Sequence, residues 1–251
     1  GVSLTGIMDS VMTNGTEPGL EKRLETLRKV AVATNKEFAE ELKIPQSAAV
    51  TCVKPSGTVS NLVDSASGIH ARHAEYYIRT VRADKQDPLA QFMIEAGFYA
   101  ESDVTRPENA WVFYFPQKAP KGAVTRNERT AIEQLEFWRL YQNHWCEHKP
   151  SATIYVQEEE WLDVGAWIYR HFDTVSGLAF LPNLEHIYKQ APYIDCTRDE
   201  YEKWVKKMPT KVDWTKLAAY ETLDTTTGSQ ELACAAGACD VVDIPSRGSA
   251  K

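Results

Sequence analysis

The run Thr153-Ile-Tyr-Val156, the segment 158–172 and the run Leu178-Ala-Phe-Leu181 together decide the fold class. The two apolar runs have the length and composition of buried strands. The segment between them has apolar residues at helical spacing, and its three leading glutamates complement the positive end of a helix. Because a helix that connects two neighbouring strands indicates parallel pairing, the sequence predicts an α/β fold with mostly parallel strands.

The alternation of strands and helices extends over most of the chain. We expect further strands at 48–53, 76–82 and 111–115, and helices at 17–42, 130–147 and 197–208. Another helix begins at Asp87-Pro88 and ends at Gly97, since Pro near the first turn and Gly past the end are usual boundary residues. Residues 1–220 are therefore predicted to fold as the α/β part. Residues 221–251 are small, polar and rich in Gly and Ala, and we expect them to form a flexible arm.

The composition is that of a globular protein. Of its 251 residues, 43% are hydrophobic, enough for one sizeable core or two small ones. No apolar run reaches the roughly 18 residues that a membrane span needs. A net charge of −7 argues against general binding to nucleic acid or to anionic membranes. The chain begins without Met and without the blocks of a signal peptide, so it reads as the inside of a longer protein.

A glycine-containing loop follows the predicted strand at 48–53 and precedes a short helix. Such a junction directs backbone N–H groups outward, and its hydroxyls add further hydrogen-bond donors, so a phosphate would fit there. It is not a Walker loop, because the GxxxxGK[ST] pattern is absent. The alternative is a tight turn with a Ser/Thr helix cap. The candidate phosphate-binding residues are Pro55, Ser56, Gly57, Thr58, Val59 and Ser60.

Two cysteines of the predicted arm, Cys234 and Cys239 in CAAGAC, are candidates for redox chemistry. Small residues separate them, so the two thiols can approach each other and form a disulfide, and a reductase protein can reach them. A zinc site would need two further ligands, which the neighbouring sequence does not supply. The alternative is a pair of unpaired surface thiols. The odd total of five cysteines at mostly wide spacing fits a reducing cytosol.

Other polar clusters are weaker candidates. His144 and His148 share a helical face beside Cys146, but the HExxH pattern is absent, so packing and capping roles are expected instead of a metal site. The same interpretation applies to His70 and His73.

Three arginines, Arg72, Arg79 and Arg82, form a basic stripe in the sequence. This stripe would serve a ligand that carries phosphate, or else it is simply the solvated face of a strand.

Several segments in order resemble adenosylcobalamin-dependent (class II) ribonucleotide reductases, over nearly the whole chain. They are GVSLTGIMD at 1–9, CVKPSGTVSNLVDSASGIHARHAEYYIRTVRAD at 52–84, EHKPSATIYV at 147–156, EEEWLDVGAW at 158–167, SGLAFLPNLEHIYKQAPY at 176–193, and CAAGAC at 234–239. The resemblance implies about half of a ten-stranded α/β barrel, built in the family from two five-stranded halves, followed by a flexible redox tail. Residues 1–220 would be the C-terminal half of this barrel.

The resemblance also implies roles for particular residues. The loop from Pro55 to Ser60 would hold the phosphates of a ribonucleotide substrate. Cys234 and Cys239 would carry reducing equivalents into the active site and be reduced again by thioredoxin. The stretch from Gln190 to Tyr193 is similar to one near the substrate site of the family, with no specific role implied.

One departure from the family pattern limits the implied activity. The family forms a thiyl radical, with adenosylcobalamin, on a cysteine in an Asn-Pro-Cys-Gly-Glu type of motif, and no such motif occurs here. The chain would therefore be inactive without an N-terminal part that carries this cysteine. A split subunit, a fragment left by an intein and a truncation all remain open. The residues of the matching motifs resemble those of the triphosphate reductases more than those of the diphosphate reductases, which favours triphosphate substrates.

Two other function classes stay open at this point. The chain would be a catalytically inactive nucleotide-binding module if it kept only the phosphate loop, although such a module needs no cysteine pair. It would alternatively be an α/β enzyme that acts alone on another phosphorylated substrate.

Overall fold

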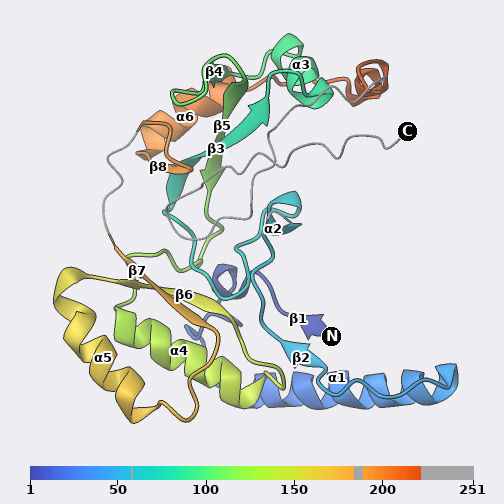
Figure 1. Ribbon diagram of the computed structural model, residues 1–251, viewed down its shortest axis with the longest axis vertical. Helices are drawn as coiled ribbons and strands as arrows, with labels where there is room; N and C mark the ends of the chain where they lie inside the picture. The colour runs from blue at the N-terminus through green and yellow to red at the C-terminus, as the bar shows by residue number, and fades with distance from the viewer. Residues whose placement is uncertain (58, 184–188, 222–251) are drawn as a thin grey trace, which may run out of the picture. The chain divides into compact units, whose positions relative to one another are not determined.

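The computed structural model describes residues 1–57, 59–183 and 189–221, and the chain divides into two compact units (Figure 1). Unit 1 consists of Gly1–Glu75 and Ala119–Glu185, and unit 2 of Tyr76–Lys118 and His186–Lys251. The predicted division of the chain at residue 220 stays a prediction. None of the described helices is long and apolar enough to cross a membrane.

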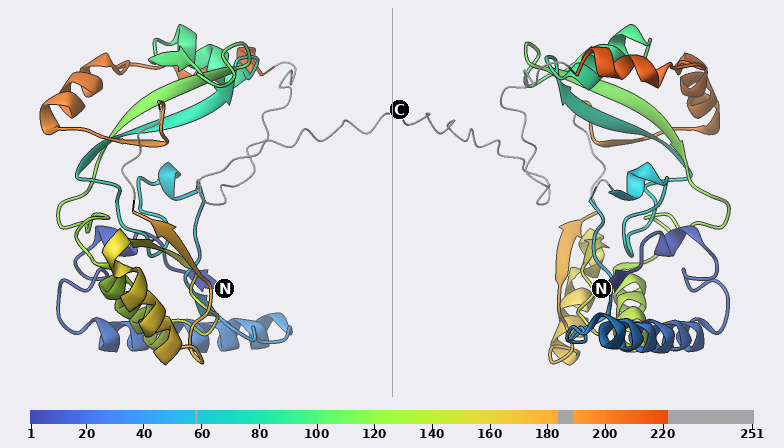
Figure 2. Two further views of the ribbon diagram at one scale, coloured as in Figure 1. Left: turned by 60° about the vertical axis from the view of Figure 1, so that its left-hand side comes forward. Right: turned by 90° about the vertical axis from the view of Figure 1, so that its right-hand side faces the viewer.

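Unit 1 is an α/β unit with two pairs of parallel strands. Its elements are β1 (Val2–Ser3), the 3-10 helix η1 (Ile7–Asp9), α1 (Leu20–Leu42), β2 (Thr51–Cys52), α2 (Val59–Leu62), α4 (Ala131–His144), β6 (Ala152–Val156), the 3-10 helix η2 (Glu158–Glu160), α5 (Trp161–Arg170) and β7 (Leu178–Pro182). β1 pairs with β2, and β6 pairs with β7, each through a helical crossover. The strand-helix-strand prediction for 153–181 is therefore confirmed. Figure 2 shows α4 and α5 lying against the β6–β7 pair.

The core of unit 1 forms around α4. Thr130 caps this helix in a capping box with Glu133, so the helix begins where the sequence predicts. Residues at helical spacing on its inner face, Leu135, Trp138 and Tyr141, are fully buried. They pack in one cluster with Leu20 and Leu24 of α1, Ile154 and Val156 of β6, and Val164 and Trp167 of α5.

Helix α1 confirms the helix predicted at 17–42, with its start three residues later. It begins at Leu20, because Gly19 is in the left-handed region with a φ of 83°. Leu24 and Ala39 are buried, whereas three other apolar residues of the helix, Leu27, Phe38 and Leu42, are exposed. Figure 1 shows the second half of the helix extending past α4. The segment after the helix still contacts this half, because Ser47 forms hydrogen bonds of 3.2 Å and 3.0 Å with Asn35.

Unit 2 is built on an antiparallel sheet of order β4-β5-β3-β8. Its elements are β3 (Tyr76–Asp84), α3 (Pro88–Glu95), β4 (Ala100–Ser102), β5 (Ala110–Lys118), β8 (Tyr193–Asp195), α6 (Arg198–Lys207) and the 3-10 helix η3 (Trp214–Ala219). The expectation of mostly parallel strands is wrong for this unit, since β3 and β5 pair antiparallel over their whole lengths. The three-residue strand β4 follows α3 and pairs with β5, so α3 is not a crossover between parallel strands. No closed barrel forms among the described strands.

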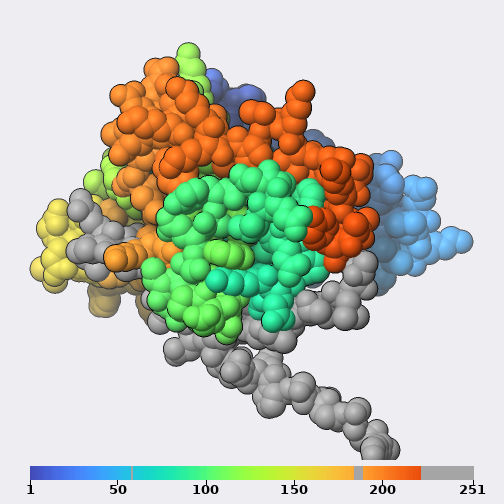
Figure 3. All heavy atoms as spheres, turned by 90° about the horizontal axis from the view of Figure 1, so that it is seen from above, coloured from blue at the N-terminus to red at the C-terminus, as the bar shows by residue number. Residues whose placement is uncertain are grey.

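Helices cover both faces of this sheet. Phe92 and Met93 of α3 pack with Phe113 on one face, where Trp214 lies 5.3 Å from the Phe92 ring centroid. In Figure 3 the orange-red atoms of η3 adjoin the green atoms of α3. On the other face, Trp204 of α6 stacks on Tyr114 at an interplanar angle of 9°.

Candidate functional site

The candidate phosphate loop connects β2 to α2, as the sequence predicts. Thr58 lies outside the described residues. Gly57 has a φ of 58°, in the left-handed region, and among the described residues other than its chain neighbours no atom lies within 4 Å of the position that a Cβ would take. Pro55 and Val59 are exposed, whereas Ser60 is buried. The loop therefore offers open space beside the backbone at Gly57.

A second stretch of chain, residues 64–70, lies behind the loop and is called the backing segment below. Ser56 N–H donates to Ser67 Oγ over 2.9 Å, and Ser56 Oγ donates to the same oxygen over 3.0 Å. Gly68 approaches so closely that an added Cβ would lie 2.8 Å from the carbonyl oxygen of Lys54. Sequence reasoning missed this support, because hydrogen bonds between side chains 11 residues apart leave no periodic signal.

His70 ends the backing segment and joins it to β6. Its Nδ1 lies 2.8 Å from the carbonyl oxygen of Ser67, and its Nε2 lies 3.1 Å from the backbone N–H of Thr153. A carbonyl can only accept and an N–H can only donate, so the ring is the neutral tautomer with the proton on Nδ1. Burial lowers the pKa of His70, which agrees with a neutral ring.

The charged group of Lys54, at the start of the loop, is already engaged. Its Nζ donates to the carbonyl oxygen of Lys149 over 2.6 Å and to Ser151 Oγ over 3.2 Å. The ammonium group therefore joins the loop to the segment before β6.

Within the loop, Ser56 gives both its backbone N–H and its hydroxyl to Ser67, and Val59 N–H donates to the Ser56 carbonyl over 3.1 Å. The phosphate-binding role of the loop stays a prediction.

Arg72 holds the backing segment from the other side. Its guanidinium is 5% exposed and forms two parallel hydrogen bonds with Asp9, of 2.7 Å from Nε and 2.9 Å from Nη2. Its Nη1 lies 3.0 Å from Asp64 Oδ1. Asp9 also accepts from the backbone N–H of Ala66. Arg72 is thus paired with carboxylates inside unit 1 and has a structural role.

The predicted basic stripe is therefore wrong. Arg79 and Arg82 lie on β3 in unit 2, and since successive side chains of a strand alternate between faces, the two point to opposite sides of the sheet. Arg82 is paired with the buried Asp103, at 2.6 Å, and the Arg79 guanidinium lies 4.4 Å from the centroid of the Tyr193 ring. These three arginines make separate internal contacts.

The other polar clusters of the sequence also have structural contacts. His144 Nδ1 lies 2.9 Å from Glu25 Oε1, which joins α4 to α1. Cys146 is buried, and burial raises the pKa of its thiol to about 12. Arg126 donates to His73 Nδ1 over 3.1 Å. Among the residues that the structure describes, no three His, Cys, Asp or Glu side chains are grouped to hold a metal ion.

Gln190, in the stretch that resembles one near the substrate site of the reductases, makes structural contacts that the sequence did not predict. Its amide donates to the carbonyl oxygen of Ser102 and accepts from the backbone N–H of Val104, both over 2.9 Å. It has a φ of 57°, which is uncommon for a residue other than Gly. Gln190 therefore anchors its segment to the end of β4 within unit 2.

The predicted redox pair, Cys234 and Cys239, lies outside the described residues. Their role as a thiol shuttle stays a prediction.

Comparisons with known proteins identify relatives of the chain, although no protein-family model matches the sequence. The adenosylcobalamin-dependent ribonucleoside-triphosphate reductase of Euglena gracilis is 29% identical over 236 residues, which is 93% of this chain and 32% of that protein. A probable adenosylcobalamin-dependent ribonucleoside-triphosphate reductase of Dictyostelium discoideum is 30% identical and covers 86% of this chain and 29% of that protein. The Lactobacillus gasseri reductase of the same name is 29% identical and covers 74% of this chain and 26% of that protein.

A solved structure of a B12-dependent (class II) ribonucleotide reductase has the same fold. It matches with a TM-score of 0.77 at 23% identity and covers 90% of this chain and 35% of that chain. The chain thus spans about a third of the length of the proteins that it matches.

The paired Arg72 gives a first prediction. Arg72→Met should lower the free energy of unfolding by about 3–5 kcal/mol, because it leaves the Asp9 carboxylate uncompensated in a largely buried site. The measurement is urea unfolding followed by circular dichroism. The control is Arg198→Met, which removes an ion pair to Glu202 at a side chain that is 73% exposed, and should leave the free energy of unfolding nearly unchanged. Equal losses in the two variants would contradict the role of Arg72.

Proposed function

We propose, from the homology of this chain to adenosylcobalamin-dependent ribonucleoside-triphosphate reductases, that it is the C-terminal part of a B12-dependent ribonucleotide reductase. The observation that carries the proposal is the match to these reductases over 93% of the chain. The complete enzyme would reduce the 2′-hydroxyl of ribonucleoside triphosphates, or of diphosphates, by a thiyl-radical mechanism. Adenosylcobalamin would bind to the complete enzyme and supply the radical chemistry, and no residue of this chain is assigned to it.

The partner in this proposal is an N-terminal part that carries the radical cysteine. The small size of the sheets in unit 1 supports the need for this partner. The strands of unit 1 form parallel pairs of only two strands each, whereas parallel sheets are normally larger and covered on both faces. Unit 1 would then supply about half of a ten-stranded α/β barrel, and the partner would supply the rest.

Exposed apolar side chains on α5 and just after it also support a partner. Leu162 is 88% exposed, Tyr169 85% and Phe172 73%, and the spacing of these residues places them along one side of the helix. A contiguous apolar stripe that faces water usually marks an interaction surface. The exposed apolar side chains of α1, Leu27, Phe38 and Leu42, would form a second contact region.

The loop from Pro55 to Ser60 would bind the phosphates of the substrate. The open space at Gly57 supports this role, because a phosphate oxygen can approach the backbone there without meeting a side chain. The hydrogen bonds from Ser56 to Ser67 support it too, since they fix the loop before a ligand arrives.

Cys234 and Cys239 would be the redox shuttle. The two thiols would give two electrons and two protons to a disulfide in the active site of the complete enzyme and would themselves become a disulfide. Thioredoxin would then return two electrons and two protons to Cys234 and Cys239 by thiol-disulfide exchange. The chain would need both cysteines for repeated turnover.

Reconstitution tests the proposal directly. Deoxynucleotide formation from CTP and from CDP is measured with adenosylcobalamin, thioredoxin and thioredoxin reductase, first with this chain alone and then with an N-terminal reductase part. We expect product only from the mixture, because the radical cysteine is absent from this chain. Nucleotide binding without product in either case would favour an inactive binding module. Product from this chain alone would contradict the proposal.

Gly57→Ala tests the phosphate loop. The added methyl group would occupy the open space, so CTP should bind on the order of tenfold more weakly, a change of about 1.4 kcal/mol. The measurement is calorimetric titration of this chain with CTP. Gly19→Ala is the matched control, since Gly19 also has a positive φ, of 83°, and open space around its Cβ position. Unchanged affinity in Gly57→Ala would argue against the loop as the phosphate site.

If Cys234 and Cys239 act as the shuttle, their loss should affect turnover with thioredoxin more than turnover with a small dithiol. In the reconstituted enzyme, Cys234→Ser or Cys239→Ser should abolish turnover with thioredoxin, whereas a small dithiol that reaches the active site directly should still support some. Cys196→Ser is the control, because Cys196 is half-buried in unit 2 and has no part in the proposed shuttle. Equal loss of turnover with thioredoxin and with the small dithiol would contradict the shuttle.

A further inference from the structure

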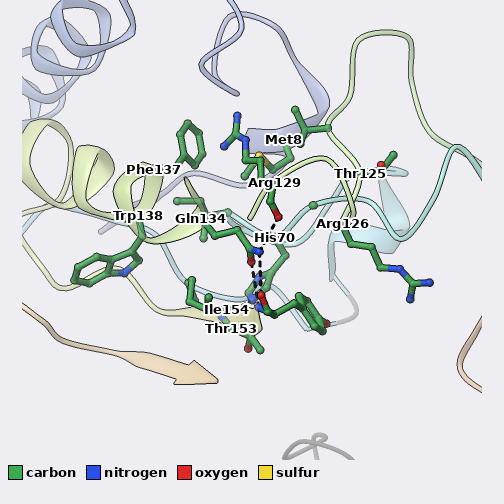
Figure 4. Close-up of a pocket in the computed structure, with 15 residues that line it drawn as sticks. Met8, His70, Thr125, Arg126, Arg129, Gln134, Phe137, Trp138, Thr153 and Ile154 are labelled. Carbon is green, nitrogen blue, oxygen red and sulfur yellow. Dashed lines mark hydrogen bonds between the residues drawn. The ribbon is translucent and has the colours of Figure 1, made fainter. Parts of the chain in front are cut away.

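His70 occupies a position that neither the proposed phosphate loop nor the proposed shuttle uses directly. It lines a small cavity of about 30 Å³ in unit 1, together with Gln134 of α4 and Thr153 of β6 (Figure 4). Figure 4 shows His70 and Gln134 both directed toward the backbone of β6. The half-buried ring is therefore held between the backing segment and β6 inside unit 1.

A short series of hydrogen bonds runs from β6 through His70 to the loop. Thr153 N–H donates to His70 Nε2 over 3.1 Å, and His70 Nδ1–H donates to the Ser67 carbonyl over 2.8 Å. Ser67 Oγ then accepts from both the backbone N–H and the hydroxyl of Ser56. Two residues, His70 and Ser67, thus connect a core strand to the candidate phosphate loop.

The backing segment is also attached through its backbone, since the carbonyl oxygens of Ala66 and Gly68 accept from Gly6 N–H and Ile7 N–H over 2.8 Å and 3.2 Å. Two further sets of attachments involve side chains. Thr5 Oγ1 donates to the Ala66 carbonyl over 3.0 Å and accepts from Gly68 N–H over 3.0 Å. The second set is the ion pair of Arg72 with Asp9 and Asp64 described above. His70 is the titratable group of this support whose ordinary pKa lies near neutrality.

Protonation of His70 would break this link. A protonated ring carries N–H on both nitrogens, so Nε2–H would face the N–H of Thr153, and two donors cannot form a hydrogen bond. The charged side chains among the described residues that line the same cavity, Arg126 and Arg129, are both cations, so this lining offers a protonated ring no carboxylate partner.

The remaining charged and titratable groups around His70 do not offset this effect. Arg72 is neutralised by its two carboxylates, and Lys54 is engaged by Lys149 and Ser151. Tyr155, which also lines the cavity, is neutral in this pH range. The neutral ring is therefore the form that the site stabilises.

We propose that His70 is a positioning residue for the phosphate loop: its neutral ring, held between Thr153 and Ser67, fixes the backing segment that orients Ser56, and nucleotide affinity falls when the ring gains a proton. The inference rests on the proposed role of the loop. Burial lowers the pKa of His70, so its protonation begins below the ordinary value of 6.5. The affinity is then full at neutral pH and is lost as the pH falls through the pKa of the folded state.

The experiment is calorimetric titration of this chain with CTP between about pH 8 and about pH 5. Because the terminal phosphate of CTP itself titrates near pH 6, each variant is compared with the wild type. Wild-type affinity should fall more steeply than that of His70→Gln, by up to tenfold for each pH unit below the pKa of His70. Glutamine can both donate and accept but does not titrate, so it should flatten the profile. His144→Gln is the matched control and should keep the wild-type profile.

Amide hydrogen exchange tests the positioning role of His70 without a ligand. Amide hydrogen exchange at Ser56 and at Thr153 should speed up, relative to the intrinsic rates, as the pH falls in the wild type, and not in His70→Gln. If CTP fails to bind the wild type at any pH while the exchange result holds, the role of the loop fails and the positioning by His70 survives. If His70→Gln keeps the wild-type profiles of exchange or of binding, the positioning role is overturned.

Discussion

The candidate site depends on the ion pairs that Arg72 forms with Asp9 and Asp64. Its side chain joins Asp9 at the end of η1 to Asp64 after α2. Its backbone forms hydrogen bonds of 3.1 Å and 2.9 Å with Val124 and Arg126. One residue therefore fixes three stretches that are far apart in the chain. A guanidinium that is largely buried must keep its carboxylate partners, because an unpaired charge there costs several kcal/mol. The positions of η1, the backing segment and the start of α4 follow from this constraint, and the phosphate loop rests on the second of them.

The basic residues Lys54 and Arg72, beside the candidate phosphate loop and its backing segment, already have hydrogen-bond partners within unit 1. Lys54 gives its charge to a carbonyl and a hydroxyl, and Arg72 gives its charge to carboxylates, so neither is available to a substrate. An anion at Gly57 would therefore meet neither of these two charges. A site of that kind would discriminate by shape and by hydrogen-bond direction more than by charge.

Local patterns predicted the elements of unit 1 well. The cap at Thr130 and the spacing of Leu135, Trp138 and Tyr141 identify α4, and apolar runs identify β6 and β7. The antiparallel sheet of unit 2 was missed, because β4 is a three-residue polar strand with no alternation to detect. The loop itself was predicted, but its support was not. Thr153 and His70 lie 83 residues apart, and a hydrogen bond over that separation has no signature in a single sequence. The predicted basic stripe of Arg72, Arg79 and Arg82 was wrong, because spacing along the chain does not reveal which partner each arginine contacts.

The stretch 76–118 leaves unit 1 and returns to it at adjacent points. Tyr76 and Lys118 face each other at the ends of β3 and β5, and the next residues outward, Glu75 and Ala119, are joined by a hydrogen bond of 2.9 Å. An insertion or a deletion within this stretch can therefore be accommodated without moving the two ends, because the Glu75–Ala119 hydrogen bond holds them together.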